Sequence, residues 1–158
     1  MKPQKLNVSS PRIAEWLDAT SWADSLNWED LVTLAPYLDA YECKKGTVIF
    51  KEGDLRKLMA ILVDGTVEIL KTNETMKKKV LAKVRSPQTI GEMSLIDGQP
   101  KSAEVKAAMQ CTFLLLSKPS FESMAEEHPK LAVKVLHRIS SLISQRLRLA
   151  SGRLVDLT

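Results

Sequence analysis

The chain has 158 residues and a formal net charge of +4, and its 44% hydrophobic and 27% charged residues are typical of a soluble globular protein. No apolar run approaches the roughly 20 residues of a membrane-spanning helix, and the N-terminus lacks the apolar stretch of a secretory signal. Cys43 and Cys111 are the only cysteines, which excludes a disulfide framework and favours reduced thiols in the cytoplasm.

The first predicted elements are two short amphipathic helices. Ser10 is the expected N-cap of the first helix, with Pro11 at the first helical position, and Asn27 is the expected cap of the second. Apolar residues recur at three- and four-residue steps after each cap, which is the period of a helix with one buried face. Pro36 predicts that the second helix kinks or ends there.

Beyond Cys43 the pattern changes to short runs rich in valine, isoleucine, leucine and threonine. Their spacing and the turn residues between them predict an antiparallel barrel or sandwich, and the lack of intervening helical patterns argues against a parallel α/β sheet. Asp64-Gly65 joins two runs directly, so we expect a two-residue type I′ hairpin there. The predicted strands are Thr47–Lys51, Leu58–Val63, Thr66–Leu70, Lys79–Val84, Ser102–Ala107 and Thr112–Leu116. The lysine cluster at 77–79 is expected in a solvated hairpin loop.

Two further helices are predicted after the strands, the second being unusually long. Pro119 opens a short helix, and Pro129 opens one that runs to Ser151, about 34 Å in length. Gly152 is expected to end or bend it. The long helix either packs on the barrel or meets a second copy of itself, and its length favours the second alternative. The apolar stripe for this contact is Leu136, Ile143, Leu147 and Leu154.

The segment Ile90–Val105 carries a candidate ligand site. Gly91 lets the backbone approach a ligand closely, and Met93 and Ser94 can begin a helical turn whose N–H groups are free for an anion. Glu92 is a poor neighbour for a phosphate but a good acceptor for a sugar hydroxyl beside one.

Lys101 and Ser102 return to the same place from the far side of the loop. The lysine supplies positive charge, and the serine supplies a hydroxyl and an N–H. The ligand inferred from these residues is a phosphate attached to a ribose. The alternative is a helical turn between strands in which Glu92 and Lys101 are merely solvated or paired.

Five segments, taken in order and spacing, resemble the cyclic nucleotide-binding domain family over most of the chain, from about Leu26 to Leu154. The resemblance implies a mainly β fold, an antiparallel β-roll of jelly-roll type with N-terminal helices and a long C-terminal helix. The segments are KKGTVIFKEGD (44–54), ILVDGTVEI (61–69), IGEMSL (90–95), QPKSAEV (99–105) and HPKLAVKVL (128–136).

The resemblance also implies roles for the residues of the candidate site. In the family, the acidic residue at the position of Glu92 takes the ribose 2′-hydroxyl. The backbone that follows it and the basic residue at the position of Lys101 take the cyclic phosphate. The implied ligand is a cyclic nucleotide, cyclic AMP or cyclic GMP, with a similar phosphorylated or anionic small molecule as the alternative, and no cofactor is implied.

The chain departs from the family pattern at three places. Lys101 stands where members that bind tightly usually carry arginine, which can meet two phosphate oxygens with a planar fork. Pro87-Gln88 stands where the family often has a Gly-Asp turn. At the end of the long helix, where bacterial activators often place two hydroxyl residues against the base, Ala150-Ser151 leaves only the Ser151 hydroxyl.

The sequence does not support a metal site or an enzyme active site. His128 and His137 are nine residues apart and do not share a helix face as a metal pair would, and His128 instead marks the start of the long helix. No Ser/His/Asp set or P-loop is present, so we predict neither a metal site nor an enzyme.

The chain therefore divides, by prediction, into an N-terminal helical segment (1–25), a cyclic-nucleotide-binding-type β-roll (26–128) and a C-terminal dimerisation helix (129–158). We expect a complete, stand-alone sensor that forms a homodimer and acts on a downstream protein. Direct DNA binding is not expected, because no helix-turn-helix follows the long helix. The alternative is a β-roll without a ligand that serves as a dimerisation or docking module.

Overall fold

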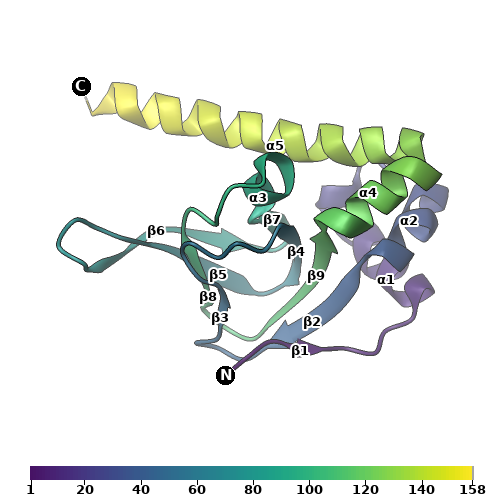
Figure 1. The fold of residues 1–158 in the computed structure, drawn as a ribbon, viewed down its shortest axis with the longest axis horizontal. Helices are drawn as coiled ribbons and strands as arrows, with labels where there is room; N and C mark the ends of the chain where they lie inside the picture. The colour runs from purple at the N-terminus through teal and green to yellow at the C-terminus, as the bar shows by residue number, and fades with distance from the viewer. Residues whose placement is uncertain (158) are drawn as a thin grey trace.

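The computed structural model describes residues 1–157 and arranges nine strands of this part of the chain in two antiparallel sheets (Figure 1). One sheet has the order β1-β2-β9-β4-β7 and the other the order β3-β8-β5-β6. The two sheets curl around one interior and form a β-roll. The strands are β1 (Gln4–Lys5), β2 (Asp39–Cys43), β3 (Val48–Phe50), β4 (Leu58–Asp64), β5 (Thr66–Thr72), β6 (Lys78–Arg85), β7 (Gln88–Ile90), β8 (Glu104–Ala107) and β9 (Cys111–Ser117).

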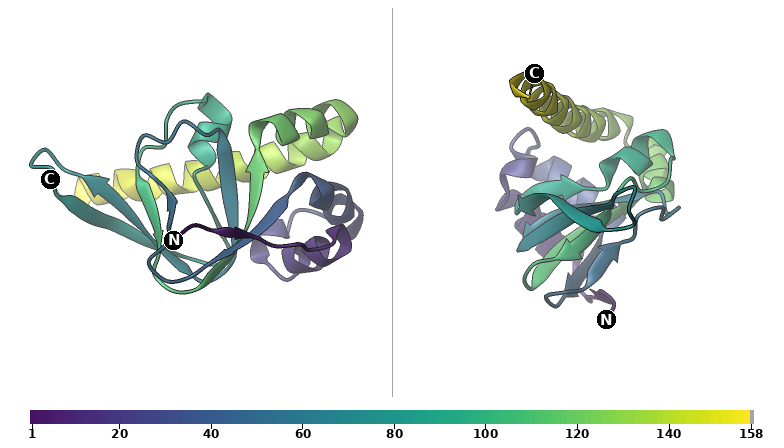
Figure 2. Two further views of the ribbon diagram at one scale, coloured as in Figure 1. Left: turned by 60° about the horizontal axis from the view of Figure 1, so that its bottom comes forward. Right: turned by 90° about the vertical axis from the view of Figure 1, so that its left-hand side faces the viewer.

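Helices cover one end of the roll and cross it. The N-terminal helices and α4 gather at the same end, while α5 runs along the molecule, so that its C-terminal end lies on the same side as the β5–β6 hairpin (Figures 1 and 2). The elements are α1 (Ser10–Asp18), the 3₁₀ turn η1 (Ser21–Ala23), α2 (Trp28–Leu34), the 3₁₀ turn η2 (Ala35–Tyr37), α3 (Glu92–Asp97), α4 (Lys118–Glu127) and α5 (Pro129–Asp156).

The predicted ends of α2 agree with the structure, and the predicted cap of α1 is displaced by one residue. Asn27 caps α2, as predicted, and the structure adds that it does so in a reciprocal capping box with Asp30. At Pro36 the α-helix has given way to the 3₁₀ turn η2, so the predicted end is confirmed. The first helix starts at Ser10, so Ser9 rather than Ser10 occupies its cap position.

The six predicted strands are all present, with ends shifted by up to two residues. The sequence patterns did not identify β1, β2 and β7. These strands are short or carry charged and polar residues, as in the sequence DAYEC of β2. Their pairing with longer neighbours, rather than their own composition, makes them strands.

The expected hairpin at Asp64-Gly65 is wrong. β4 pairs with β7 and β9, whereas β5 pairs with β6 and β8, so the chain passes from one sheet to the other at this point. Gly65 has a φ of +113°, and a Cβ there would lie 2.7 Å from both the Cys111 Sγ and the Gln110 carbonyl oxygen. Glycine is needed here because the backbone passes very close to the start of β9 as the chain changes sheets, and not because of a turn between paired strands.

The lysine cluster does not lie wholly in a loop. The turn between β5 and β6 ends at Lys77, and the next two lysines belong to β6. Lys78 pairs with the buried Glu104 of β8 at 3.2 Å. Backbone pairing with β5, of Lys78 with Thr72 and of Lys79 with Lys71, places this part of the cluster in regular structure.

Two buried clusters lie on opposite faces of the five-stranded sheet. Along β4, Met59 and Ile61 belong to the cluster shared with the helices, whereas Ala60 and Leu62 belong to the interior of the roll. Because successive side chains of a strand point to opposite faces, a strand covered on both sides reads as a continuous apolar run. The division of the chain into three segments stays a prediction, although α1, β4 and α5 contribute to one cluster.

The long helix α5 has 28 residues and a length of about 42 Å. It begins at Pro129 after His128, as predicted. Gly152 neither ends nor bends it enough to interrupt it, because a glycine in a helix interior costs only about 1 kcal/mol relative to alanine. Its buried residues all lie in the first half: Leu131, Ala132, Val135 and Ile139. Within residues 1–157, no helix combines the length and apolar character needed to cross a bilayer.

Cys43 and Cys111 are directly opposite each other on β2 and β9, and both are buried. Burial raises the pKa of the Cys43 thiol to about 11, so the reactive thiolate is scarce at neutral pH. We expect two free thiols when the non-reduced protein is titrated with a thiol reagent in denaturant, and slow labelling without denaturant. Finding no free thiol would contradict both this prediction and the predicted cytoplasmic location.

Candidate functional site

The site begins where β7 ends and α3 starts. Gly91 has a φ of +72°, in the left-handed region that favours glycine. A Cβ at this position would lie 2.7 Å from the Lys101 Nζ and 2.9 Å from a ring carbon of Phe50. The glycine is therefore required both by its backbone conformation and by the two side chains that pack against it.

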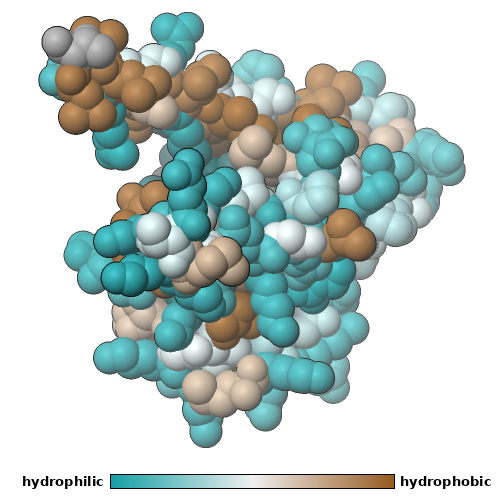
Figure 3. All heavy atoms as spheres, turned by 60° about the vertical axis from the view of Figure 1, so that its left-hand side comes forward, coloured by the Kyte–Doolittle hydropathy of each residue, from teal (hydrophilic) through white to brown (hydrophobic). Residues whose placement is uncertain are grey.

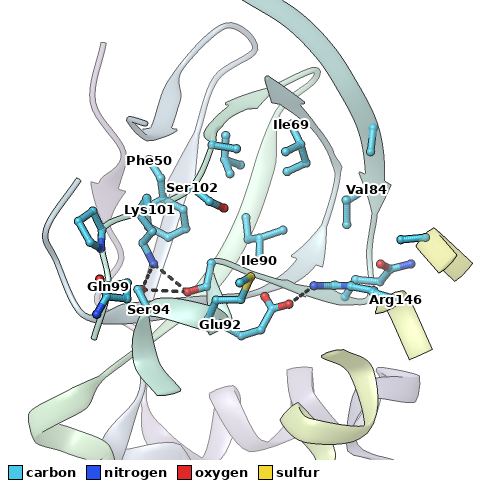
Figure 4. Close-up of a pocket in the computed structure, with 18 of the residues that line it drawn as sticks. Phe50, Ile69, Val84, Ile90, Glu92, Ser94, Gln99, Lys101, Ser102 and Arg146 are labelled. Carbon is cyan, nitrogen blue, oxygen red and sulfur yellow. Dashed lines mark hydrogen bonds and ion pairs between the residues drawn. The ribbon is translucent and has the colours of Figure 1, made fainter. Parts of the chain in front are cut away.

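The ammonium group of Lys101 lies in a cradle of protein oxygens (Figure 4). It donates to the Gly91 carbonyl at 2.8 Å, to the Ser94 hydroxyl at 2.6 Å and to the Leu58 carbonyl. The Nζ also lies 4.4 Å from the centroid of the Phe50 ring. An ammonium has three N–H donors, so these oxygens use all of them.

Lys101 is deeply buried for a lysine, with 5% of its surface exposed. Burial lowers the pKa of the ammonium to about 8, because desolvation penalises the charged form. Asp54 and Glu92 oppose this effect through their charges. The positive charge at this position is thus easily lost in alkaline solution.

The carboxylate of Glu92 is paired with α5. Glu92 is 3% exposed and forms an ion pair with Arg146, whose second Nη donates to the Thr89 carbonyl at 2.6 Å. Arg146 was not among the predicted site residues. It is 54 positions from Glu92 in the sequence, and no local pattern marks such a partner.

These residues surround one cavity of about 490 Å³, which is within the usual range for small-molecule pockets. Its wall comes from the α3 segment, the loop after α3, the inner face of the roll and the second half of α5 (Figure 4). The lining residues are Phe50, Ile69, Ala82, Val84, Gln88, Ile90, Gly91, Glu92, Met93, Ser94, Asp97, Gln99, Pro100, Lys101, Ser102, Ala103, Val105, Arg146, Leu149, Ala150 and Arg153.

Six of the seven predicted ligand-binding residues line this cavity: Gly91, Glu92, Met93, Ser94, Lys101 and Ser102. Ser151 does not line it and is exposed. The α5 residues that do line it are Arg146, Leu149, Ala150 and Arg153, which share one face through their three- and four-residue spacing. Ser151 lies about 100° around the helix from Ala150 and so leaves that face.

A β-roll whose partly apolar cavity is lined on one side by the long C-terminal helix has the architecture of a ligand-binding module. A family model described as "Cyclic nucleotide-binding domain" matches residues 41–128, more than half of the chain. The protein therefore belongs to the cyclic nucleotide-binding domain family, and its β-roll fold is the fold of that family.

Solved and curated relatives agree with this assignment. A cyclic nucleotide-binding domain from Methylobacillus flagellatus KT is 27% identical, with a TM-score of 0.87 over 99% of this chain and 90% of that one. The cAMP-activated global transcriptional regulator of Salmonella typhimurium is 29% identical over 72% of this chain and 52% of its own length.

A lysophospholipase of Chaetomium globosum is 26% identical over 70% of this chain but only 7% of its own length. The chain thus spans about half of the length of one of these curated relatives and much less of the other. The similarity concerns one shared domain, and the activities of the longer proteins do not follow from it.

Proposed function

We propose that the cavity binds a cyclic nucleotide, either cyclic AMP or cyclic GMP, and that the domain is a non-enzymatic regulatory sensor. The carrying observation is that residues from two separate motifs, 91–94 and 101–102, line one cavity of about 490 Å³. One part of the cavity is polar and is formed by residues 91–94 and 101–102, which we call the cassette. The other part is an apolar wall formed by residues such as Ile69 and Val84. A ribose phosphate suits the polar part, and a flat base suits the apolar part.

The cyclic phosphate would be held by the Ser102 hydroxyl, by backbone N–H groups of the cassette and by the charge of Lys101. Because the three donors of Lys101 are already used by protein oxygens, direct contact requires at least one of these bonds to be exchanged for a phosphate oxygen. Ser94 can compensate, since its hydroxyl lies 3.1 Å from the Gly91 carbonyl and 3.2 Å from the Leu58 carbonyl.

The ribose would be held by Glu92, which connects the ligand to α5. The Glu92 carboxylate is already paired with Arg146, so a ribose 2′-hydroxyl would share or displace this partner. Sharing and displacement hold α5 differently against the cavity. The ligand would therefore bias two positions of α5 by its difference in affinity for them. This coupling is the proposed route to a downstream protein.

Calorimetric titration of the full chain with cyclic AMP and cyclic GMP tests the proposal. We expect saturable binding of at least one of them. Ser102→Ala should weaken binding about 3- to 10-fold, the usual effect of losing one hydrogen bond. Ser140→Ala, a matched change on α5 at a residue that does not line the cavity, should leave it unchanged. The absence of heat with both nucleotides would overturn the proposal.

One observation favours the alternative of a β-roll without a ligand. The buried charges of Glu92 and Lys101 are both engaged by groups of the protein itself, so neither charge needs a ligand as its partner. In that case neither nucleotide would give heat, and the domain would serve as a dimerisation or docking module. The same titration separates the two functions.

We also propose that the protein is a homodimer formed through α5. Apolar side chains remain exposed along its second half (Figure 3). Among them, Leu147 and Leu154 are each 65% exposed. They align with Leu136 along one stripe of the helix. Ile143, which belongs to the predicted stripe, is partly buried against the core instead.

We expect light scattering to give the mass of a dimer for the intact chain. Leu147→Glu combined with Leu154→Glu should give a folded monomer, because two buried charges at a symmetric contact meet their own copies. Ser141→Glu with Gln145→Glu adds the same charge to the other side of α5 and should leave the dimer intact. A monomer before any substitution would refute the proposal.

A further inference from the structure

The two ends of the cavity differ in chemistry. Lys101, Ser94 and Gln99 lie at one side of it, and Ile69, Val84 and Arg146 lie at the other (Figure 4). If a cyclic nucleotide binds as proposed, its phosphate lies near Lys101 and its ribose near Glu92. The base then extends along the apolar wall toward the second half of α5.

Arg153 is the charged residue that α5 places beyond the ribose position. The lining residues Arg146 and Arg153 are seven positions apart on the same face of the helix, which is about 10 Å along its axis. Arg146 is used by Glu92 and Thr89. Within residues 1–157, the side chain of Arg153 forms no hydrogen bond or ion pair.

A guanidinium group can only donate hydrogen bonds, so it discriminates between purines. Guanine presents two adjacent acceptors, O6 and N7, whereas adenine presents the acceptor N7 beside the 6-amino donor. An arginine that meets this edge gains two bonds with guanine and faces a donor with adenine. Gln88, which also lines the cavity, carries a donor and an acceptor and therefore favours neither base.

We propose that Arg153 makes the cavity selective for a purine with a 6-oxo group, so that cyclic GMP binds more tightly than cyclic AMP. This inference rests on the proposed function and adds the identity of the base to it. A bidentate arginine contact to a guanine edge discriminates against the wrong base by roughly 5- to 150-fold.

The test is calorimetric titration of the full chain with cyclic GMP, cyclic AMP and cyclic inosine monophosphate, which has the 6-oxo group without the 2-amino group. We expect cyclic GMP and cyclic inosine monophosphate to bind at least about 5-fold more tightly than cyclic AMP. Arg153→Gln should remove most of this difference, because glutamine offers both a donor and an acceptor. Arg148→Gln is the matched control on the same helix, at a residue that does not line the cavity, and should preserve the difference.

The outcomes separate this inference from the proposed function. Equal or tighter binding of cyclic AMP by the wild type would overturn the role of Arg153 while a cyclic nucleotide still binds. A preference that survives Arg153→Gln, or cyclic inosine monophosphate that behaves like cyclic AMP, would overturn it as well. If none of the three nucleotides binds, the proposed function fails, and this inference fails with it.

Discussion

Lys101→Ala should lower the free energy of unfolding by about 2–4 kcal/mol. The substitution removes a donor from the Leu58 and Gly91 carbonyls and the Ser94 hydroxyl, and it removes the side-chain packing against Phe50. The single Ser94 hydroxyl can donate to only one of the two carbonyls, so a buried acceptor without a donor accounts for much of the loss. Chemical denaturation by urea measures it as a lower midpoint with an unchanged slope.

Two comparisons sharpen this result. Lys101→Met should be less destabilising, because methionine retains an apolar chain against Phe50. Lys45→Ala, at an exposed turn, should change stability by less than about 0.5 kcal/mol. If Lys101→Ala is as mild as Lys45→Ala, the oxygens around the ammonium do not depend on it.

The stability contributed at Lys101 should also depend on pH. Its pKa is about 8 in the folded protein and about 10.5 in the unfolded chain. Between these values the unfolded chain holds a proton that the folded protein has released, so raising the pH favours folding. Relative to Lys101→Met, the wild type should gain about 1–3 kcal/mol from pH 8 to 10.5. A flat difference across this range would contradict the lowered pKa.

Arg146→Ala should have the second large effect, a loss of about 2–3 kcal/mol of stability together with loosening of α5. The substitution leaves the buried Glu92 carboxylate without its partner and removes a donor to the Thr89 carbonyl. Since the buried residues of α5 end at Ile139, this link is a main attachment of its second half. Hydrogen exchange should become faster for amides after residue 140.

A double-mutant cycle isolates the ion pair. Glu92→Gln removes the charge that Arg146→Ala leaves unpaired, so the double variant should be more stable than Arg146→Ala alone. Arg148→Ala, an exposed change on the same helix, serves as the control for loss of an arginine. Strictly additive losses at Glu92 and Arg146 would mean that the pair is not coupled.

Much of the architecture was predictable because the chain's local patterns agree with its fold. Asn27, Pro36 and Pro129 act at helix ends for reasons that involve only their neighbours in the sequence. The β4 run is apolar because both of its faces are covered. The Asp64-Gly65 hairpin failed because the same dipeptide can end a strand that continues in another sheet.

By itself, the sequence determined an antiparallel β domain, the long final helix and the segment that carries the candidate site, because these depend on periodicity and on motifs a few residues long. The β-roll in particular followed from the resemblance of five segments to a known family. Only the tertiary structure decided what the site residues contact. Lys101 meets the carbonyl of Leu58, 43 positions away, and Glu92 meets Arg146, 54 positions away. The partner of a buried charge is the group that packing brings within hydrogen-bond distance, and packing joins elements whose local sequences carry no record of each other.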